Sequence, residues 1–402
     1  MLAGRLRLPD AAVHARLPWL TFGLRLRLSN WGAMTRRISL LPLFLFLILG
    51  TANFSLAEKN FAVAQVRAKI ARLQQSRKEK PITDKNWAEV FSSVGDELRG
   101  AGEALDSNHL YLSLEKLGHA EDLLQGARRA VDQAVIEKGG FEAFQSEWGK
   151  VSTRLTTLDT DEHRREWGAA PMAIRALAES STTKATPLLE GGLGFATANG
   201  PKDGLFYVGE AEGEADFTSF LWSLSFAGGR TPSVTLRSFL PELQSLQERT
   251  NAAFQPPKSI DLHSRFIALN GTIKLAKELD AARFYAGALY VYLEAMRHYG
   301  MLEQKPLDAD QKARLTRRLP MEWKELSSAE KDESIAQLFV ERAESYVQHA
   351  DGSAPSEDEW RSAQIIVDQV LPAYYAAQKP AAPVQMTQGK TVDITLVRWP
   401  YT

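Results

Sequence analysis

Apolar residues recur every three or four positions along most of this 402-residue chain, which is the spacing of one face of an α-helix. Between residues 61 and 80 the apolar positions include Phe61, Val66, Ile70 and Leu73, and the pattern ends at Pro81. Comparable stretches continue to about residue 377. We therefore expect an all-α fold, either an irregular bundle or a short solenoid of antiparallel helix pairs.

The middle and the end of the chain depart from this pattern. Residues 180–186 are rich in hydroxyl and β-branched side chains, and glycines at 191, 192 and 194 predict a break. The segment 227–233 contains two glycines and Pro232, and so is expected to be a loop. We place there the boundary between two helical regions, 58–226 and 234–378. Residues 379–402 form an Ala- and Pro-rich linker followed by an alternating segment, so we expect an extended or strand-like tail.

A predicted export signal begins at Met34. Arg36 and Arg37 form a basic start, residues 38–50 are apolar, and Ser55-Leu56-Ala57 has the small-x-small pattern of a cleavage site. The apolar run is shorter than the roughly 20 residues of a membrane-spanning helix. We therefore expect cleavage near Ala57, no stable membrane anchor afterwards, and a periplasmic or secreted protein. Residues 1–33 are interpreted as sequence upstream of the true start.

Composition narrows the classes of function. After cleavage the chain would keep 345 residues with 48 acidic and 41 basic side chains, a net charge of −7. This sign disfavours a nucleic-acid-binding surface. The chain has no cysteine, which excludes disulfides, thiol nucleophiles and thiolate metal sites.

Two segments resemble each other. Residues 105–113 read LDSNHLYLS and residues 279–287 read LDAARFYAG, and residues 206–209 give a shorter third match. Each match has a tyrosine followed two residues later by a small residue, which would let a second helix approach closely. The pattern resembles helix-pair repeats of the tetratricopeptide kind. The three tyrosines are 96 and 78 residues apart, which is no fixed period, so no family is assigned.

Three pairs of polar residues lie four positions apart on predicted helices, and so share a helix face. They are Glu115 with His119, Glu210 with Glu214, and Glu294 with His298. Packed together, they would resemble the ligands of ferritin-like di-iron proteins, whose motif places Glu three residues before His instead of four. The alternative is that these pairs face solvent. No cofactor is predicted.

Aromatic residues give a second set of candidates. We consider as possible ligand-binding side chains Tyr111, Tyr207, Tyr285, Tyr290 and Tyr292. They are either core residues or the lining of a groove between helix pairs. Ser181 and Lys184 have the Ser-x-x-Lys spacing of acylating enzymes, without companion motifs, and are interpreted as a chance match.

These observations lead to two hypotheses of different classes. The first is an exported, non-catalytic binding or scaffold protein whose partner is a protein or another macromolecule, not nucleic acid. The second is a metal-dependent or hydrolytic exported enzyme that uses the Glu and His pairs. The sequence identifies neither a ligand nor an oligomeric state.

Overall fold

A computed structural model describes residues 61–226, 230–255, 260–302, 305–349 and 352–378. In these ranges the regular structure is helical, apart from one isolated bridge between Pro232 and Asp332. The expected all-α fold is confirmed. The predicted leader, its upstream segment and the strand-like tail after residue 378 lie outside the described residues and stay predictions.

The helices of the first half follow the predicted stretches. A first helix covers residues 61–79, and then come α2 (Ala88–Asp106), α3 (Leu110–Val131), α4 (Ala134–Arg164), α5 (Met172–Asn199) and α6 (Leu205–Ser223). The helices of the second half are α7 (Leu240–Ala253), α8 (His263–Ala281), α9 (Tyr285–Gly300), α10 (Ala309–Ser328), α11 (Ser334–Val347), α12 (Glu357–Ile365) and α13 (Leu371–Ala377). A 3₁₀ turn, Ile260–Leu262, precedes α8, and a π-helical turn, Ile366–Val370, joins α12 to α13.

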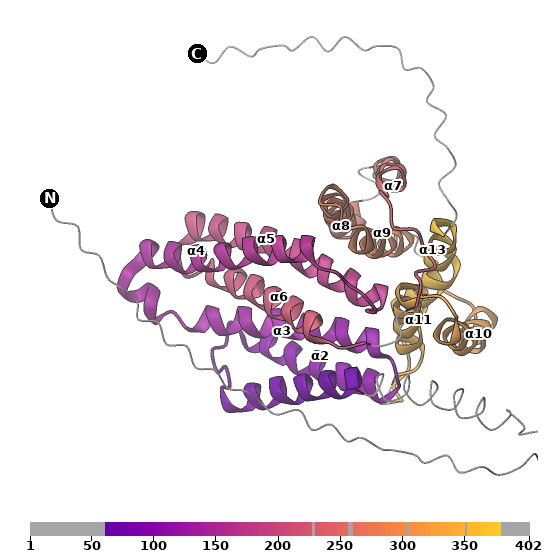
Figure 1. Ribbon diagram of the computed structural model, residues 1–402, viewed down its shortest axis with the longest axis horizontal. Coiled ribbons are helices and arrows are strands. Elements are labelled where there is room, and N and C mark those ends of the chain that lie inside the picture. The colour runs from indigo at the N-terminus through magenta and orange to yellow at the C-terminus, as the bar shows by residue number, and fades with distance from the viewer. Residues whose placement is uncertain (1–60, 227–229, 256–259, 303–304, 350–351, 379–402) are drawn as a thin grey trace, which may run out of the picture. The chain divides into compact units, whose positions relative to one another are not determined.

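Sequential helices pack in pairs, and α3 and α6 make the most extensive contact between two helices (Figure 1). This contact explains the glycines of α6. A Cβ at Gly209 would collide with the backbone of Gln125, and one at Gly213 would collide with the backbone of Asp122. Glycines four residues apart therefore let the two backbones meet, as small residues do at close helix crossings.

The predicted break in α5 is wrong. The helix continues through the hydroxyl-rich stretch, through Pro187 and through the glycines to Asn199. Gly192 is a packing residue, because a Cβ there would meet the carbonyl oxygen of Gly204 at 2.9 Å. By contrast, α4 does contain a kink, at Gly140, which has φ of 57°.

The joints α2–α3 and α8–α9 have the same local structure. Each contains one non-glycine residue with positive φ, Asn108 (62°) or Arg283 (64°). The next residue's N–H closes the turn, from His109 to Ala104 and from Phe284 to Leu279. Structurally equivalent residues of the two joints are thus 175 positions apart. The sequence alignment that matches Tyr111 with Tyr285 has an offset of 174, one residue fewer. In this register Glu115 is equivalent to Tyr290, so the two Glu-His pairs are not copies of one another.

Buried carboxylates distant in the sequence hold the N-terminal ends of four helices. Glu341 of α11 accepts the N–H of Leu112 at the start of α3, at 2.9 Å. Glu179 of α5 accepts the N–H of Gly287 at the same position of α9, at 2.7 Å. Asp332 and Asp280 do the same for α5 and α7, by accepting the N–H groups of Met172 and Phe239. None of these four helices has its own N-cap side chain, so the partner acids satisfy groups that burial would leave unpaired.

Two hydrophobic clusters form the core of the described residues. The larger one contains residues from both sides of segment 227–233, such as Leu117 of α3 and Phe339 of α11. The smaller one lies between α4, α5 and α6, around Phe144. The division into regions 58–226 and 234–378 stays a prediction, although apolar packing crosses it.

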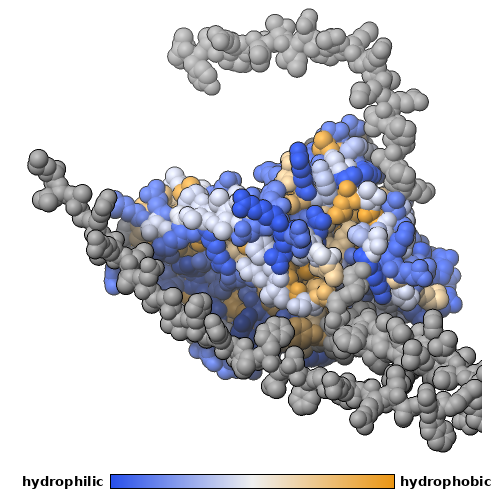
Figure 2. Space-filling view, viewed as in Figure 1, coloured by the Kyte–Doolittle hydropathy of each residue, from blue (hydrophilic) through white to orange (hydrophobic). Residues whose placement is uncertain are grey.

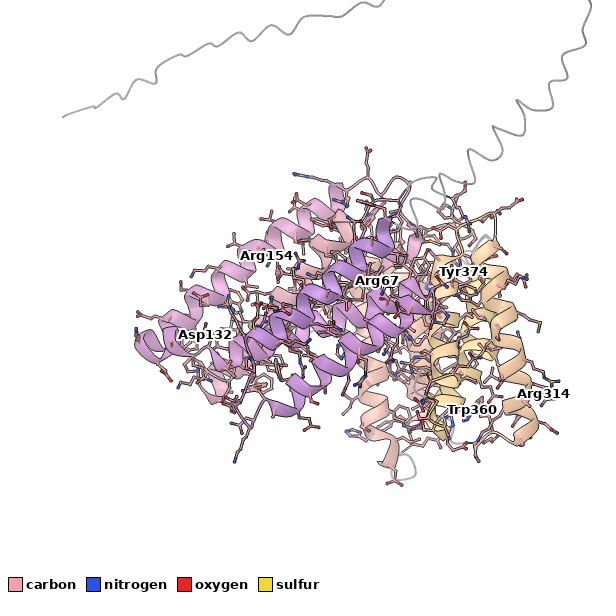
Figure 3. The ribbon with its side chains drawn as sticks, turned by 90° about the horizontal axis from the view of Figure 1, so that it is seen from below. Arg67, Asp132, Arg154, Arg314, Trp360 and Tyr374 are labelled. Atoms are coloured by element: carbon pink, nitrogen blue, oxygen red, sulfur yellow. The ribbon has the colours of Figure 1, made fainter. Side chains whose placement is uncertain are left out.

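Charged contacts join the first helix to its neighbours. Arg67, labelled on that helix in Figure 3, pairs with Asp106 at the end of α2, 2.7 Å away. Lys69 forms a buried ion pair with Glu121 of α3. The first helix is thus fixed against both α2 and α3.

Candidate functional site

A cavity of about 600 Å³ lies among side chains of α2, α3, α5, α6, α8, α9 and α11. Its volume is within the range of small-molecule sites. Its lining includes four acidic and four basic residues, which are Glu97, Glu115, Glu214 and Glu294 with Lys116, Lys184, Arg297 and Arg342. We call this space the central cavity. Apolar side chains such as Leu177, Phe217 and Val291 complete the lining, and the surface seen in Figure 2 likewise mixes hydrophilic and hydrophobic residues.

The first group of charges connects α3, α9 and α11. Arg342, whose side chain is 8% exposed, forms ion pairs with both Glu115 and Glu294. The Tyr290 hydroxyl donates to Glu115 at 2.6 Å, and Arg297 pairs with Glu294 at 3.1 Å. Two arginines therefore share two carboxylates, and we call these five residues the arginine cluster.

The second group connects α3, α5 and α6. Lys184 lies 2.9 Å from Asp122 and also forms an ion pair with Glu214. The Ser181 hydroxyl donates to Glu214, and His119 Nδ1 lies 3.6 Å from Asp122. We call these five residues the lysine cluster. The close contact of α3 with α6 places Asp122 beside Glu214, because Gly213 touches the backbone of Asp122.

The two clusters differ in their charge balance and in how they shift the pKa values of their members. The hydrogen bond to Asp122 raises the pKa of His119, whereas burial and the nearby Arg297 lower the pKa of His298. Burial raises the pKa of Glu214 to about 7 despite Lys184. Burial also acts on Glu294, but Arg342 and Arg297 outweigh it and lower its pKa to about 2. The lysine cluster sets one lysine against two carboxylates, whereas the arginine cluster balances two carboxylates with two arginines, so the lysine cluster is the more negative of the two.

A second cavity of about 860 Å³ adjoins the first. The two share a wall made of Leu112, Lys116, Ser345 and Tyr346. The second cavity contains two histidine–carboxylate pairs at 3.0 Å, His109 with Glu344 and His349 with Glu359. Trp323 also lines it, and the buried indole N–H has no hydrogen-bond partner among the described residues.

Five of the six predicted Glu and His candidates line the central cavity. They are Glu115, His119, Glu214, Glu294 and His298. The sixth, Glu210, does not line it, although the charges of Asp122 and Glu214 act on its carboxyl group. The solvent-facing alternative is wrong for Glu115 and Glu294, because each forms an ion pair with Arg342.

The metal hypothesis receives no support from this arrangement. In the described part of the chain, no three His, Asp or Glu side chains are arranged to hold a metal ion. The carboxylates converge on Arg342 and Lys184, so side-chain cations occupy the positions that the hypothesis gave to metal.

The tyrosines are dispersed. Tyr290 lines the central cavity, while Tyr292 is buried near the charges of Glu242 and Arg249. Tyr207 stacks on Phe195, with ring centroids 4.7 Å apart. Tyr111 is partly buried near Asp332 and Ser334, and Tyr285 is the first residue of α9. Of the five predicted tyrosines, Tyr290 is thus the one that lines the central cavity.

The sequence reasoning missed five residues of the two clusters. Arg342, Arg297 and Asp122 have no motif around them, and Ser181 and Lys184 were interpreted as a chance match. The structure places both residues of that match in the central cavity. The signal available was their spacing of three, which puts both on one face of a helix.

The chain matches no known family model, no curated protein and no solved structure. Among the described helices none combines the length and the apolar character that crossing a membrane requires.

Proposed function

We propose that this chain is an exported, non-catalytic binding protein that holds a small polar ligand in the central cavity. One observation carries the proposal: the cavity of about 600 Å³ is lined by paired charges contributed by helices of both halves of the chain. Burying several charges costs free energy unless they are paired. If the lining only stabilised the fold, apolar residues would do so without the free-energy cost of desolvating charges. A polar ligand therefore explains why the lining is charged.

The state of Lys184 favours binding over hydrolysis. An acylating Ser-x-x-Lys site needs a lysine that can accept a proton from serine. Here two carboxylates, Glu214 and Asp122, raise the pKa of Lys184, whose side chain is 42% exposed. A lysine held protonated cannot act as the base for Ser181. The macromolecular partner expected from the sequence stays a prediction beside this ligand.

Thermal shift and native mass spectrometry test the binding proposal. The probes are free amino acids, dipeptides, saccharides, dicarboxylates and polyamines, each added to the chain that begins at residue 58. We expect at least one class to raise the melting temperature and to appear as a bound mass. Ser180→Phe, which fills the cavity without removing a charge, abolishes the effect, while Ser93→Phe on the exposed face of α2 keeps it.

Two results would contradict the binding proposal. One is that no probe class raises the melting temperature or adds a bound mass. The other is that the Ser180→Phe variant, folded by circular dichroism, binds as well as the unchanged chain.

Export is tested separately. Expression of the full chain in a bacterial host, followed by fractionation, should give a periplasmic or secreted product. Its intact mass should correspond to a chain that begins at Glu58. A cytoplasmic product that retains Met34 would overturn the export proposal, and it would leave the binding proposal untouched.

A further inference from the structure

The central cavity has two chemically distinct ends, and this arrangement narrows the class of ligand. We propose that the ligand is a compact zwitterion, an amino acid or a short peptide, with its carboxylate at Arg297 and its ammonium group between Glu97 and Glu214. This inference rests on the proposed binding function and names the ligand class for the same cavity.

The arginine cluster offers a site for a carboxylate. Arg297 uses Nε for Glu294 and Nη2 for His298, and its Nη1 has no hydrogen-bond partner in the described ranges. Tyr346 lines the same cavity as Arg297, and its hydroxyl too is without a hydrogen-bond partner in those ranges. A guanidinium edge and a hydroxyl that line one cavity are suited to a carboxylate, because both groups donate to its oxygens.

The lysine cluster offers a site for an ammonium group. Glu97 of α2 and Glu214 of α6 both line the cavity on either side of α3. Glu97 is bound only loosely, with its Oε2 atom 3.4 Å from Lys116. The charges of both Glu97 and Asp122 act on His119, so the carboxylates surround one end of the cavity. An ammonium group there would share these carboxylates with Lys116 and Lys184, which already pair with Glu97 and Glu214.

The charge balance argues against ligands that carry a single type of charge. The lining holds equal numbers of acidic and basic side chains, and nearly all of them are paired. A mono-anion or a polyamine would bring one uncompensated charge type into this partly enclosed site, which costs free energy. An apolar ligand would remove the charges from water without replacing their hydrogen bonds. A zwitterion keeps the net charge unchanged and satisfies both ends.

Calorimetric titration with matched probes tests the proposal. The probes are L-leucine and the dipeptide Ala-Leu, N-acetyl-L-leucine without the cation, L-leucinamide without the anion, and maltose. We expect at least one of the two zwitterions to bind at least tenfold more tightly than the single-charge analogues and maltose. Arg297→Gln should make leucine bind no more tightly than leucinamide. Glu97→Gln should make leucine bind no more tightly than N-acetyl-leucine. Arg67→Gln, on the exposed face of the first helix, should remove neither.

The outcomes separate the two proposals. Tighter binding of maltose or of a single-charge probe, abolished by Ser180→Phe, would overturn the zwitterion and support the binding function. Binding of no probe in either panel would overturn both. If Arg297→Gln fails to fold, Tyr346→Phe replaces it, since it removes only one hydroxyl, and unchanged selectivity for the carboxylate in that variant would contradict the proposed position.

Discussion

Arg342 is a buried cation that joins three helices through two carboxylates. Its side chain is 8% exposed, while those of Glu115 and Glu294 are 23% and 12% exposed. A buried ion pair contributes little net stability relative to apolar residues of the same size, but removing one partner leaves an uncompensated charge. The loss of Arg342 should therefore be much more harmful than the loss of an exposed arginine.

We expect Arg342→Met to lower the free energy of unfolding by about 3–5 kcal/mol at neutral pH. Urea unfolding measures it, with Arg67→Met as the control. Arg67 and Asp106 are both exposed, so that control should lose less than about 1 kcal/mol. Adding Glu115→Gln to Arg342→Met should restore part of the loss, because Glu115 would otherwise be left without a cationic partner among the described residues, whereas Glu294 keeps Arg297. A double variant as unstable as the sum of its single changes would contradict this explanation.

Two glycines in helix interiors should respond oppositely to alanine. A Cβ at Gly213 meets the backbone of Asp122, whereas a Cβ at Gly271 in α8 meets nothing within 4 Å. We expect Gly213→Ala to lose about 1–3 kcal/mol or more through overpacking. Gly271→Ala should gain about 0.5–1 kcal/mol from helix propensity. Urea unfolding of both variants checks this, and equal effects would show that α3 and α6 do not meet at Gly213.

At the scale of helices, periodicity predicted most elements but not what fixes their ends. Glu179 and Gly287 are 108 positions apart, and Glu341 and Leu112 are 229 apart, so no local pattern shows these caps. The prediction failed in α5 because glycine was interpreted as a break, whereas Gly192 allows close packing with Gly204. Tertiary contacts overrode a weak local propensity.

The same reason limits what the sequence shows of the site. The spacing of four correctly put Glu115 with His119, and Glu294 with His298, on shared faces toward one cavity. The bridging cation, Arg342, comes from a third helix and no spacing rule connects it to them. Pairwise spacing thus identified the acids but not their partners.

The cap that α5 supplies to α9 should be measurable. We expect Glu179→Ala to lower the free energy of unfolding by about 1–2 kcal/mol and to speed hydrogen exchange at the Gly287 amide. Glu179→Gln should lose less, since its amide oxygen can still accept. Ser356→Ala removes the cap that α12 carries itself, and should cost about 1 kcal/mol without affecting Gly287. Unchanged exchange at Gly287 in Glu179→Ala would rule out the cap.

For the whole molecule, many acids are buried where charge is disfavoured. Burial raises the pKa to about 7 for four glutamates, which are Glu162, Glu210, Glu214 and Glu341. Arg342 and Arg297 act in the opposite direction on Glu294, whose pKa falls to about 2. The folded chain therefore binds more protons than the unfolded chain near pH 6, and fewer near pH 3.

Stability should accordingly be greatest in mildly acidic solution. A raised carboxyl pKa means that unfolding releases protons between about pH 4.5 and 7, so the free energy of unfolding falls as pH rises through this window. Each such group contributes at most about 1.4 kcal/mol per pH unit. Below about pH 4 the ionised Glu294 must be protonated, and stability falls again. Urea unfolding at pH 2, 4, 5.5 and 8 should show a maximum at pH 4. Glu341→Gln should flatten the decline toward pH 8, because its neutral amide keeps an acceptor for Leu112 without titrating. A free energy that instead rises steadily from pH 5.5 to 8 would mean that these carboxyl groups are charged and solvated in the folded protein.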